Sequence, residues 1–310
     1  MSTDLAVARA ATAATATRKP RVKWRRIGAF AVMAILLFVT IFPFYWVVRT
    51  ALSSNSELAP ASSSITPVGL TLGGFKRALG LQTLEEAQAE GGSGAAVNFT
   101  TAFRNSLVYA TLVTLGQVTF STMAAYAFAR MRFKGRNLLF AIILAALMVP
   151  GIFTTLPNFV LIKDLGGLNT FWGMAAPGFF MAPFAIFFMR QFFLGISKEV
   201  EEAAKMDGAG NLRVFWRVIL PISAAPVSTL ALLTFINAWN DYFWPFLVGK
   251  GPETRVLTVA LGVFKAQTPG GSPDWSGLMS ATVVSVAPMV LLLVLFGKRI
   301  VNSVQFSGIK

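Results

Sequence analysis

The chain of 310 residues contains no cysteine and no histidine. Without cysteine there is neither a disulfide framework nor a thiolate metal site, and without histidine the commonest general base and metal ligand is missing. Charged residues are also scarce, at 13 % of the chain, against about 25 % in soluble proteins. This inventory argues against metal catalysis, against a serine–histidine triad and, more generally, against an enzyme. It predicts no metal site and no cofactor in this chain.

Apolar residues are abundant instead, with 55 % hydrophobic residues and 28 phenylalanines. A helix rises 1.5 Å per residue, so about 20 apolar residues cross the roughly 30 Å of hydrocarbon in a bilayer. Continuous apolar runs of this length predict helices, because barrel strands alternate over about ten residues. We therefore predict an all-α polytopic membrane protein with six transmembrane helices. The six stretches without charge are 27–48, 105–129, 137–162, 165–189, 218–240 and 275–297.

Basic residues gather beside alternate ends of these spans. Nineteen of the 27 lysines and arginines fall in the N-terminal tail, in the loops after spans two and four, and at the C-terminal end. The positive-inside rule then predicts both termini and the loop 190–217 in the cytoplasm. Because the charges flank apolar spans, they indicate topology and not nucleic-acid binding.

The predicted organisation has three parts. A basic cytoplasmic tail covers residues 1–26, a membrane domain covers 27–302, and a cytoplasmic C-terminal tail covers 303–310. Within the membrane domain, 53–103 and 249–274 are predicted external loops. Prolines inside the spans predict kinks, because each removes a helix hydrogen bond; they are Pro150, Pro157, Pro177, Pro183, Pro226 and Pro288.

Glu201–Pro221 is a polar, amphipathic segment between two apolar stretches, and we call it the signature segment. It resembles the cytoplasmic signature loop of the membrane subunits of ABC importers, Glu-Ala-Ala, three residues, Gly, nine residues, Ile, one residue, Leu-Pro. The chain departs from this pattern at Val218, which replaces the isoleucine. Six matches at this spacing have a chance probability on the order of one in ten thousand, given average residue usage. The matching residues are Glu202, Ala203, Ala204, Gly208, Leu220 and Pro221.

The resemblance extends from about residue 30 to the end and is closest to the permeases of carbohydrate importers of the maltose-transporter type, specifically the second permease. It is carried by Asn105-Ser106, 124–130, 133–136 and 237–241. It implies a type I importer fold in the bacterial cell membrane and a carbohydrate cargo, an oligosaccharide or disaccharide. The implied partners are a second homologous permease, two ATP-binding cassette subunits, an extracytoplasmic solute-binding protein and membrane lipid. The chain has no phosphate-binding loop, so ATP and Mg²⁺ would be bound by the partner ATPase subunits.

Within the signature segment we expect a short coupling helix, because three glutamates occupy a first turn and apolar positions follow helical spacing. The alanines let a partner approach closely, and Gly208 lets the chain turn. Leu212, Phe215 and Trp216 are expected to anchor the segment to the membrane-embedded body. The resemblance implies that the segment docks on the ATPase through Glu202, Ala203, Ala204, Asp207, Gly208, Leu220 and Pro221.

Asp241 directly follows the predicted span 218–240, and we treat it as the acidic candidate of that span. It lies either at the membrane interface or at the outer mouth of a transport pathway, where intramembrane carboxylates are functional. Asn237 and Asn240 carry amides that hydrogen-bond hydroxyls, and Trp239 carries a face suited to a sugar ring. These four residues are the candidates for a substrate pathway, although Trp239 equally suits an aromatic belt.

The C-terminal tail ends in Gly308 and Lys310, which either contact the ATPase, as the resemblance implies, or lie in solvent. Two other functions stay open. An ion-coupled secondary transporter would need inverted repeats and several intramembrane carboxylates. A membrane scaffold would dock a cytosolic partner through the signature segment without transporting anything.

Overall fold

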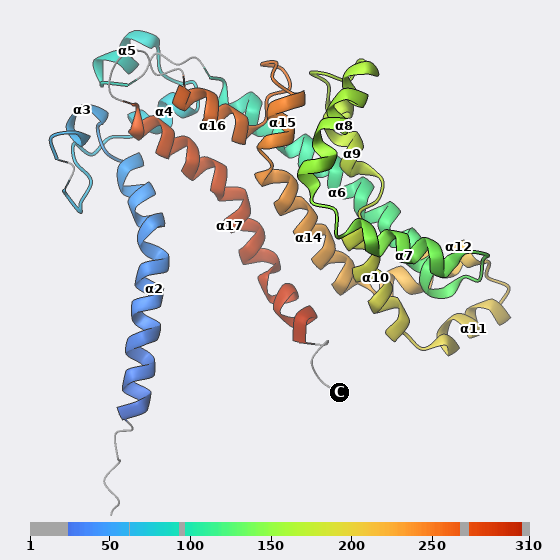
Figure 1. Ribbon diagram of the computed structural model, residues 1–310. Helices are drawn as coiled ribbons and strands as arrows, with labels where there is room; N and C mark the ends of the chain where they lie inside the picture. The colour runs from blue at the N-terminus through green and yellow to red at the C-terminus, as the bar shows by residue number, and fades with distance from the viewer. Residues whose placement is uncertain (1–23, 62, 93–96, 267–272, 306–310) are drawn as a thin grey trace, which may run out of the picture. The chain divides into compact units, whose positions relative to one another are not determined.

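The computed structural model describes residues 24–305 except 62, 93–96 and 267–272. Throughout these residues the secondary structure is helical and there is no strand (Figure 1), which confirms the predicted all-α class. The chain divides into two compact units, Met1–Trp46 and Val47–Lys310, each considered by itself. The candidate tail residues Gly308 and Lys310 lie outside the described residues.

The helices follow one another with short connections. In chain order they are α2 (Trp24–Ala51), α3 (Asn55–Leu58), α4 (Gly73–Ala78), α5 (Leu84–Ala89), α6 (Phe99–Arg130), α7 (Arg136–Ala146), α8 (Gly151–Asp164), α9 (Phe171–Phe179), α10 (Pro183–Gly195), α11 (Lys198–Met206), α12 (Asn211–Val214), the π-helix η1 (Phe215–Ile219), α13 (Leu220–Ile222), α14 (Ala224–Asn240), α15 (Phe243–Val248), α16 (Leu257–Ala266) and α17 (Trp275–Gln305).

Three unbroken helices are long and apolar enough to cross a membrane, namely Arg26–Ala51, Phe99–Arg130 and Trp275–Leu295. They correspond to the first, second and sixth predicted spans. The other three predicted spans are each split into two helices that meet at an angle. The described residues thus hold three crossings, or up to six if each bent pair makes one.

The three bends lie within the third, fourth and fifth predicted spans. They measure 100° between α7 and α8, 44° between α9 and α10, and 82° between α12–α13 and α14. Pro150 is the N-cap of α8, and Pro183 is the first residue of α10. A proline restricts the preceding residue to extended conformations, so helices end just before it. Pro157, Pro177 and Pro288 instead lie inside continuous helices.

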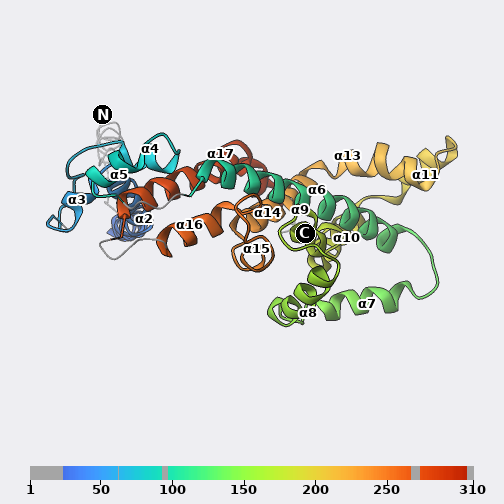
Figure 2. The same ribbon diagram turned by 90° about the horizontal axis from the view of Figure 1, so that it is seen from above.

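Helix α6 is the central element of the Val47–Lys310 unit. It begins at Asn98, whose side chain accepts a hydrogen bond from the amide of Thr101 at 2.9 Å. It packs against α9, α10, α14 and α16, and it runs beside α14 in both views (Figure 1, Figure 2). A Cβ at Gly116 would overlap Phe179, so glycine is what lets α6 and α9 approach this closely.

Two hydrophobic clusters form the core of this unit. One contains Phe99, Met174, Trp239 and Phe264 and joins α6, α9, α14 and α16. The other joins α6, α10 and the segment after α11, and it includes Tyr126, Met189, Phe193, Phe215 and Ile219. The second cluster thus fastens the signature segment to the helix bundle.

At the other end of the unit, a buried ionic network ties α4 to the start of α17. The Arg77 guanidinium lies 2.9 Å from the Asp274 carboxylate and 3.1 Å from that of Glu90. Asp274 also accepts a hydrogen bond from the amide of Gly277 at 2.8 Å. The predicted external loop 53–103 therefore contains a folded lobe of short helices, held by long-range contacts.

Helices α7 and α8 present a broad apolar surface. No residue of α7 is buried, and large side chains such as Leu138, Ile142, Phe153 and Leu156 are exposed. A soluble monomer rarely exposes apolar patches of this extent. Lipid and the helices of partner subunits are the surroundings in which such a surface is stable.

Candidate functional site

The signature segment begins with helix α11, whose ends are both capped. The Ser197 hydroxyl accepts a hydrogen bond from the amide of Glu199 at 3.3 Å, and glutamates in the first turn suit the helix dipole. The helix ends at Asp207, and Gly208 follows with φ +80°. The amide of Ala209 reaches back to the carbonyl of Ala204 at 3.0 Å, as in a Schellman cap. The expected short helix and the turn at Gly208 are both present.

One side of α11 is fixed to the bundle by a buried ion pair. Glu201 is only 4 % exposed, and its carboxylate lies 2.7 Å from Nε of Arg130, the last residue of α6. The Tyr126 hydroxyl donates to the other carboxylate oxygen at 3.4 Å. Arg130 Nη2 also donates to the carbonyls of Phe193 at 2.6 Å and Ile196 at 2.5 Å. One guanidinium therefore joins the ends of α6 and α10 to α11.

The opposite side of α11 is open. Glu202, Ala203, Asp207 and Gly208 are exposed, and Ala204 is half-buried. Met206 beside them is 88 % exposed. The arrangement gives a polar helix with small residues and one large apolar side chain on its free side.

The anchoring expected from three residues of the signature segment needs correction. Only Phe215 enters the core, where it is 2 % exposed, whereas Leu212 is 67 % and Trp216 is 47 % exposed. The buried positions are Val214, Phe215 and Ile219. Val214 ends α12, and Phe215 and Ile219 are the first and last residues of the π-helix η1. Leu212 and Trp216 instead extend the exposed apolar surface near α11.

The final Leu-Pro of the motif lies just before a sharp bend. Leu220 is half-buried and Pro221 is exposed, both in the short helix α13. The chain then turns by 82° into α14. The motif thus covers α11 and the bent connection between α11 and α14, formed by η1 and α13, which we call the elbow.

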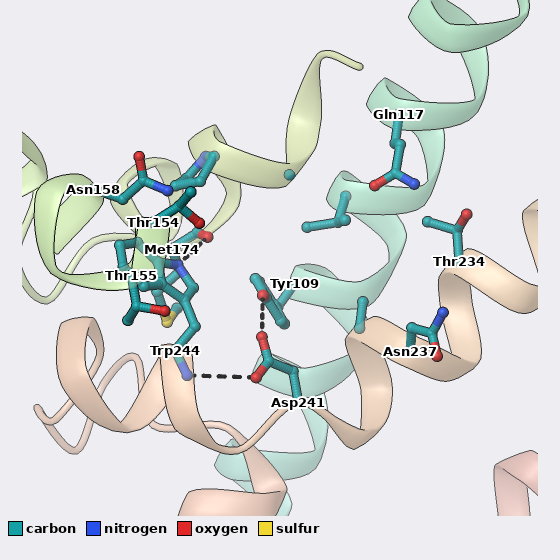
Figure 3. A pocket seen from close by; sticks show the side chains of 14 residues that line it. Tyr109, Gln117, Thr154, Thr155, Asn158, Met174, Thr234, Asn237, Asp241 and Trp244 are labelled. Atoms are coloured by element: carbon teal, nitrogen blue, oxygen red, sulfur yellow. Dashed lines mark hydrogen bonds between the residues drawn. The ribbon is translucent and has the colours of Figure 1, made fainter. Parts of the chain in front are cut away.

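A second feature, which we call the polar cavity, lies farther along α14. Its volume is about 380 Å³, and α6, α8, α9, α14 and α15 contribute to its wall (Figure 3). The wall holds one carboxylate, that of Asp241, and its other polar side chains are uncharged. Those uncharged polar residues are Tyr109, Gln117, Thr154, Thr155, Asn158, Thr234, Asn237 and Trp244.

Asp241 is held at the C-terminal end of α14. Its carboxylate accepts a hydrogen bond from the Tyr109 hydroxyl at 3.0 Å and one from the Trp244 amide at 3.4 Å, as Figure 3 shows. Its backbone carbonyl accepts from the Thr258 hydroxyl at 2.7 Å. Within the described ranges, Asp241 has no ion-pair partner, and no three acidic side chains converge as a metal site.

The four residues suggested for a substrate pathway divide into two pairs. Asn237 and Asp241 line the polar cavity. Trp239 is 3 % exposed in the core, where its Nε1 donates to the carbonyl of Ser285 at 3.2 Å. The side-chain amide of Asn240 donates a hydrogen bond to the carbonyl of Ile236, in the preceding turn of α14, at 2.9 Å. Neither Trp239 nor Asn240 belongs to the cavity wall, because both point to other sides of α14.

Sequence reasoning missed the cavity residues on α6 and α8, and it missed the pairing of Glu201 with Arg130. The available signal was the polar residue inside an apolar span, such as Gln117, Asn158 or Thr234. Arg130 belongs to the basic residues after span two that the positive-inside rule already accounts for.

Comparison with known families decides the identity of the fold. Residues 117–305 match the family described as binding-protein-dependent transport system inner membrane component. The chain belongs to this family. The match includes α11, the elbow before α14 and most of the cavity wall. Members of the family are components of transport systems and not enzymes, and the chain is a membrane-embedded component of that kind.

Curated members of the family align over most of the chain. The arabinooligosaccharides transport system permease protein AraQ of Halalkalibacterium halodurans is 29 % identical over 94 % of this chain and 98 % of its own length. The trehalose/maltose transport system permease protein MalG of Thermococcus litoralis is 30 % identical over 89 % of this chain and 94 % of its own length. The sn-glycerol-3-phosphate transport system permease protein UgpE of Yersinia pestis is 35 % identical over 64 % of this chain and 70 % of its own length.

A solved structure shares the fold. A chain in the crystal structure of a bacterial ABC transporter that imports the acidic polysaccharide alginate superposes with a TM-score of 0.76 at 23 % identity. The alignment covers 90 % of the present chain and 98 % of the chain from the alginate transporter. The family match and the permease relatives confirm the resemblance to importer permeases, and this structure shows the shared fold.

Proposed function

We propose that the chain is the permease subunit of an ATP-driven importer of carbohydrates in the bacterial cell membrane. It forms the translocation pathway with a second, homologous permease. Two ATP-binding cassette subunits bind ATP and Mg²⁺, and an extracytoplasmic solute-binding protein delivers an oligosaccharide or disaccharide. Relatives named for arabinooligosaccharides and for trehalose and maltose support this class of cargo.

The observation that carries the proposal is the two-sided construction of α11. Its inner side is fixed by the buried ion pair between Glu201 and Arg130, and its outer side leaves Glu202, Ala203 and Met206 exposed. A helix attached rigidly on one side and open on the other suits force transmission from a docked partner. A chain without a phosphate-binding loop needs such a partner to use ATP.

The proposed orientation of the Val47–Lys310 unit in the membrane is argued from its two ends. Helix α11 lies at one end, and α4, α5 and α16 lie at the other, in both Figure 1 and Figure 2. The basic residues Arg130, Arg132, Lys134 and Arg136 adjoin the α11 end. The positive-inside rule supports a cytoplasmic position for this end, where the ATPase would dock. The lobe of α4 and α5 would then face the binding protein.

In the proposed mechanism, closure of the ATPase pair on ATP displaces α11. The ion pair at Glu201 passes this displacement to α6, and the elbow at η1 and α13 passes it to α14. Both α6 and α14 supply residues to the polar cavity, so the cavity changes shape as the helices move. Such coupling requires that ATP bind better to one arrangement of the helices than to the other.

The test is uptake by proteoliposomes that contain the full assembly of both permeases and both ATPases. Radiolabelled maltose and an arabinotriose are offered with the solute-binding protein outside, and ATP or a non-hydrolysable analogue inside. We expect uptake of at least one sugar that requires ATP hydrolysis and persists when ionophores dissipate ion gradients. Uptake driven by a gradient without ATP would make the chain a secondary transporter, and association without any uptake would make it a scaffold.

A further inference from the structure

Family membership leaves the charge of the cargo open, because the related proteins are named for both uncharged and anionic compounds. The polar cavity bears on this question through its composition. Its wall contains a single ionisable carboxylate and no lysine or arginine. A site built for a phosphate or a uronate would place a lysine or an arginine against it.

We propose that Asp241 makes the polar cavity selective for uncharged saccharides and against anionic ones. This inference rests on the proposed function, since it names the class of carbohydrate that the cavity accepts. The volume of about 380 Å³ lies within the range of small-molecule sites, roughly 300–1,000 Å³.

The attractive part of the site is its set of amides and hydroxyls. Gln117, Asn158 and Asn237 line the cavity from α6, α8 and α14, and none of their side chains bonds to another described residue. Each amide offers both donors and acceptors. Sugar hydroxyls likewise donate and accept, so these three groups can satisfy an uncharged saccharide from different directions (Figure 3).

The repulsive part of the site is the carboxylate. The Tyr109 hydroxyl and the Trp244 amide both donate to it, which fixes its position and offsets part of the cost of burying its charge. Without a cation beside it, its field extends into the cavity. Consider an anionic ligand whose charge lies roughly 5 Å from this carboxylate, at an effective dielectric constant of about 20. Repulsion then weakens its binding on the order of 100-fold relative to an uncharged ligand. Specificity often depends on such a repulsive element against the wrong ligand.

The inference is tested by direct binding to the purified assembly in lipid nanodiscs. The solute-binding protein is left out, so that its own selectivity does not enter. The probes are maltose and maltobionate, which are similar in size, although maltobionate has a carboxylate and an opened reducing-end ring. Maltitol has the same open chain without the carboxylate and is the matched uncharged control, which should bind like maltose. Saturation-transfer NMR titrations give both dissociation constants. We expect the assembly to prefer maltose by at least about 30-fold, and Asp241→Asn to reduce the preference to within about threefold.

Two further variants complete the design. Asp164→Asn removes the same charge from the exposed end of α8, outside the cavity, and should keep the full preference. Asn237→Lys places a cation one helical turn before Asp241 and should reduce the preference as Asp241→Asn does. It provides the test if Asp241→Asn does not assemble.

The inference is overturned if the unmodified assembly binds both probes equally. It is also overturned if Asp241→Asn keeps the preference or loses maltose together with maltobionate. ATP-driven sugar uptake is measured on the same preparation with the binding protein present. Uptake without discrimination by charge overturns the role of Asp241 and leaves the importer function standing. Absence of uptake for every carbohydrate offered overturns the importer function itself.

Discussion

Nε of Arg130 lies 2.7 Å from the carboxylate of Glu201, and this buried pair connects the longest helix of the Val47–Lys310 unit to α11. The two residues are 71 positions apart in the chain, and both side chains are almost fully shielded. Charges buried in this way are tolerated only when they are paired and further hydrogen-bonded. The carbonyls of Phe193 and Ile196 and the Tyr126 hydroxyl meet that requirement.

Arg130→Met should therefore destabilise the permease strongly, because it leaves the Glu201 carboxylate buried without a partner. The expected loss is about 3–5 kcal/mol, measured as a lower thermal unfolding midpoint of the purified assembly. The double variant Arg130→Met with Glu201→Met should be more stable than Arg130→Met alone. Arg132→Met removes an exposed arginine two positions away and serves as the control. A double variant no more stable than the single one would contradict the pairing.

Glu202→Lys should weaken docking of the ATPase subunits without affecting the fold, because its side chain lies on the free side of α11. We expect at least about a tenfold loss in association, equivalent to about 1.4 kcal/mol, measured by co-purification and by ATPase stimulation. Glu85→Lys makes the same change on an exposed residue of α5, at the other end of the unit. If Glu202→Lys and Glu85→Lys associate equally well, α11 is not the docking site.

Gly208→Ala and Gly210→Ala form a matched pair. A Cβ at either position meets no atom within 4 Å, so neither change is sterically blocked. Gly208 has φ +80° and Gly210 has φ −70°. The left-handed conformation costs an alanine about 1–2 kcal/mol, so only Gly208→Ala should lower the thermal stability of α11 and loosen ATPase docking. Equal behaviour of the two variants would show that the turn at Gly208 is not needed.

Gly116→Ala tests the contact between α6 and α9. The added Cβ would overlap Phe179, and overpacking of this kind costs about 1–3 kcal/mol. Gly195→Ala, at the end of α10, meets nothing within 4 Å and should leave stability nearly unchanged. The two thermal midpoints, measured on the same assembly, decide the question. Equal midpoints would mean that α6 and α9 can separate at little cost.

Local and periodic features were predictable from the sequence. The apolar runs predicted helices, and the spacing from Glu202 to Pro221 predicted α11 with its turn at Gly208. These signals lie within about twenty residues of one another. Helical spacing alone assigned Leu212 and Trp216 to the core incorrectly, because spacing does not tell which side of a helix faces the bundle. Val214, Phe215 and Ile219 face it instead.

Contacts between residues that are far apart in the chain could not be predicted from the sequence. Tyr109 and Asp241 meet only because α6 and α14 pack side by side. Arg130 satisfies the positive-inside rule, so the sequence gives no separate signal of its pairing with Glu201. Trp239 had the right chemistry for a sugar, but the rotation of α14 directs it into the core. The bend angles likewise depend on packing, since Pro150 caps the start of α8 whereas Pro157 is accommodated inside the same helix.

The distribution of the cavity wall over separate helices has a consequence for release of the cargo. Gln117, Asn158 and Asn237 lie on α6, α8 and α14, so in the proposed site no single helix would hold the ligand by itself. Any motion that separates two of these helices removes some of the hydrogen bonds and admits water in their place. Affinity for the cargo is therefore a property of one arrangement of the bundle. The sugar can be let go by dispersing its binding groups, without a dedicated residue that expels it.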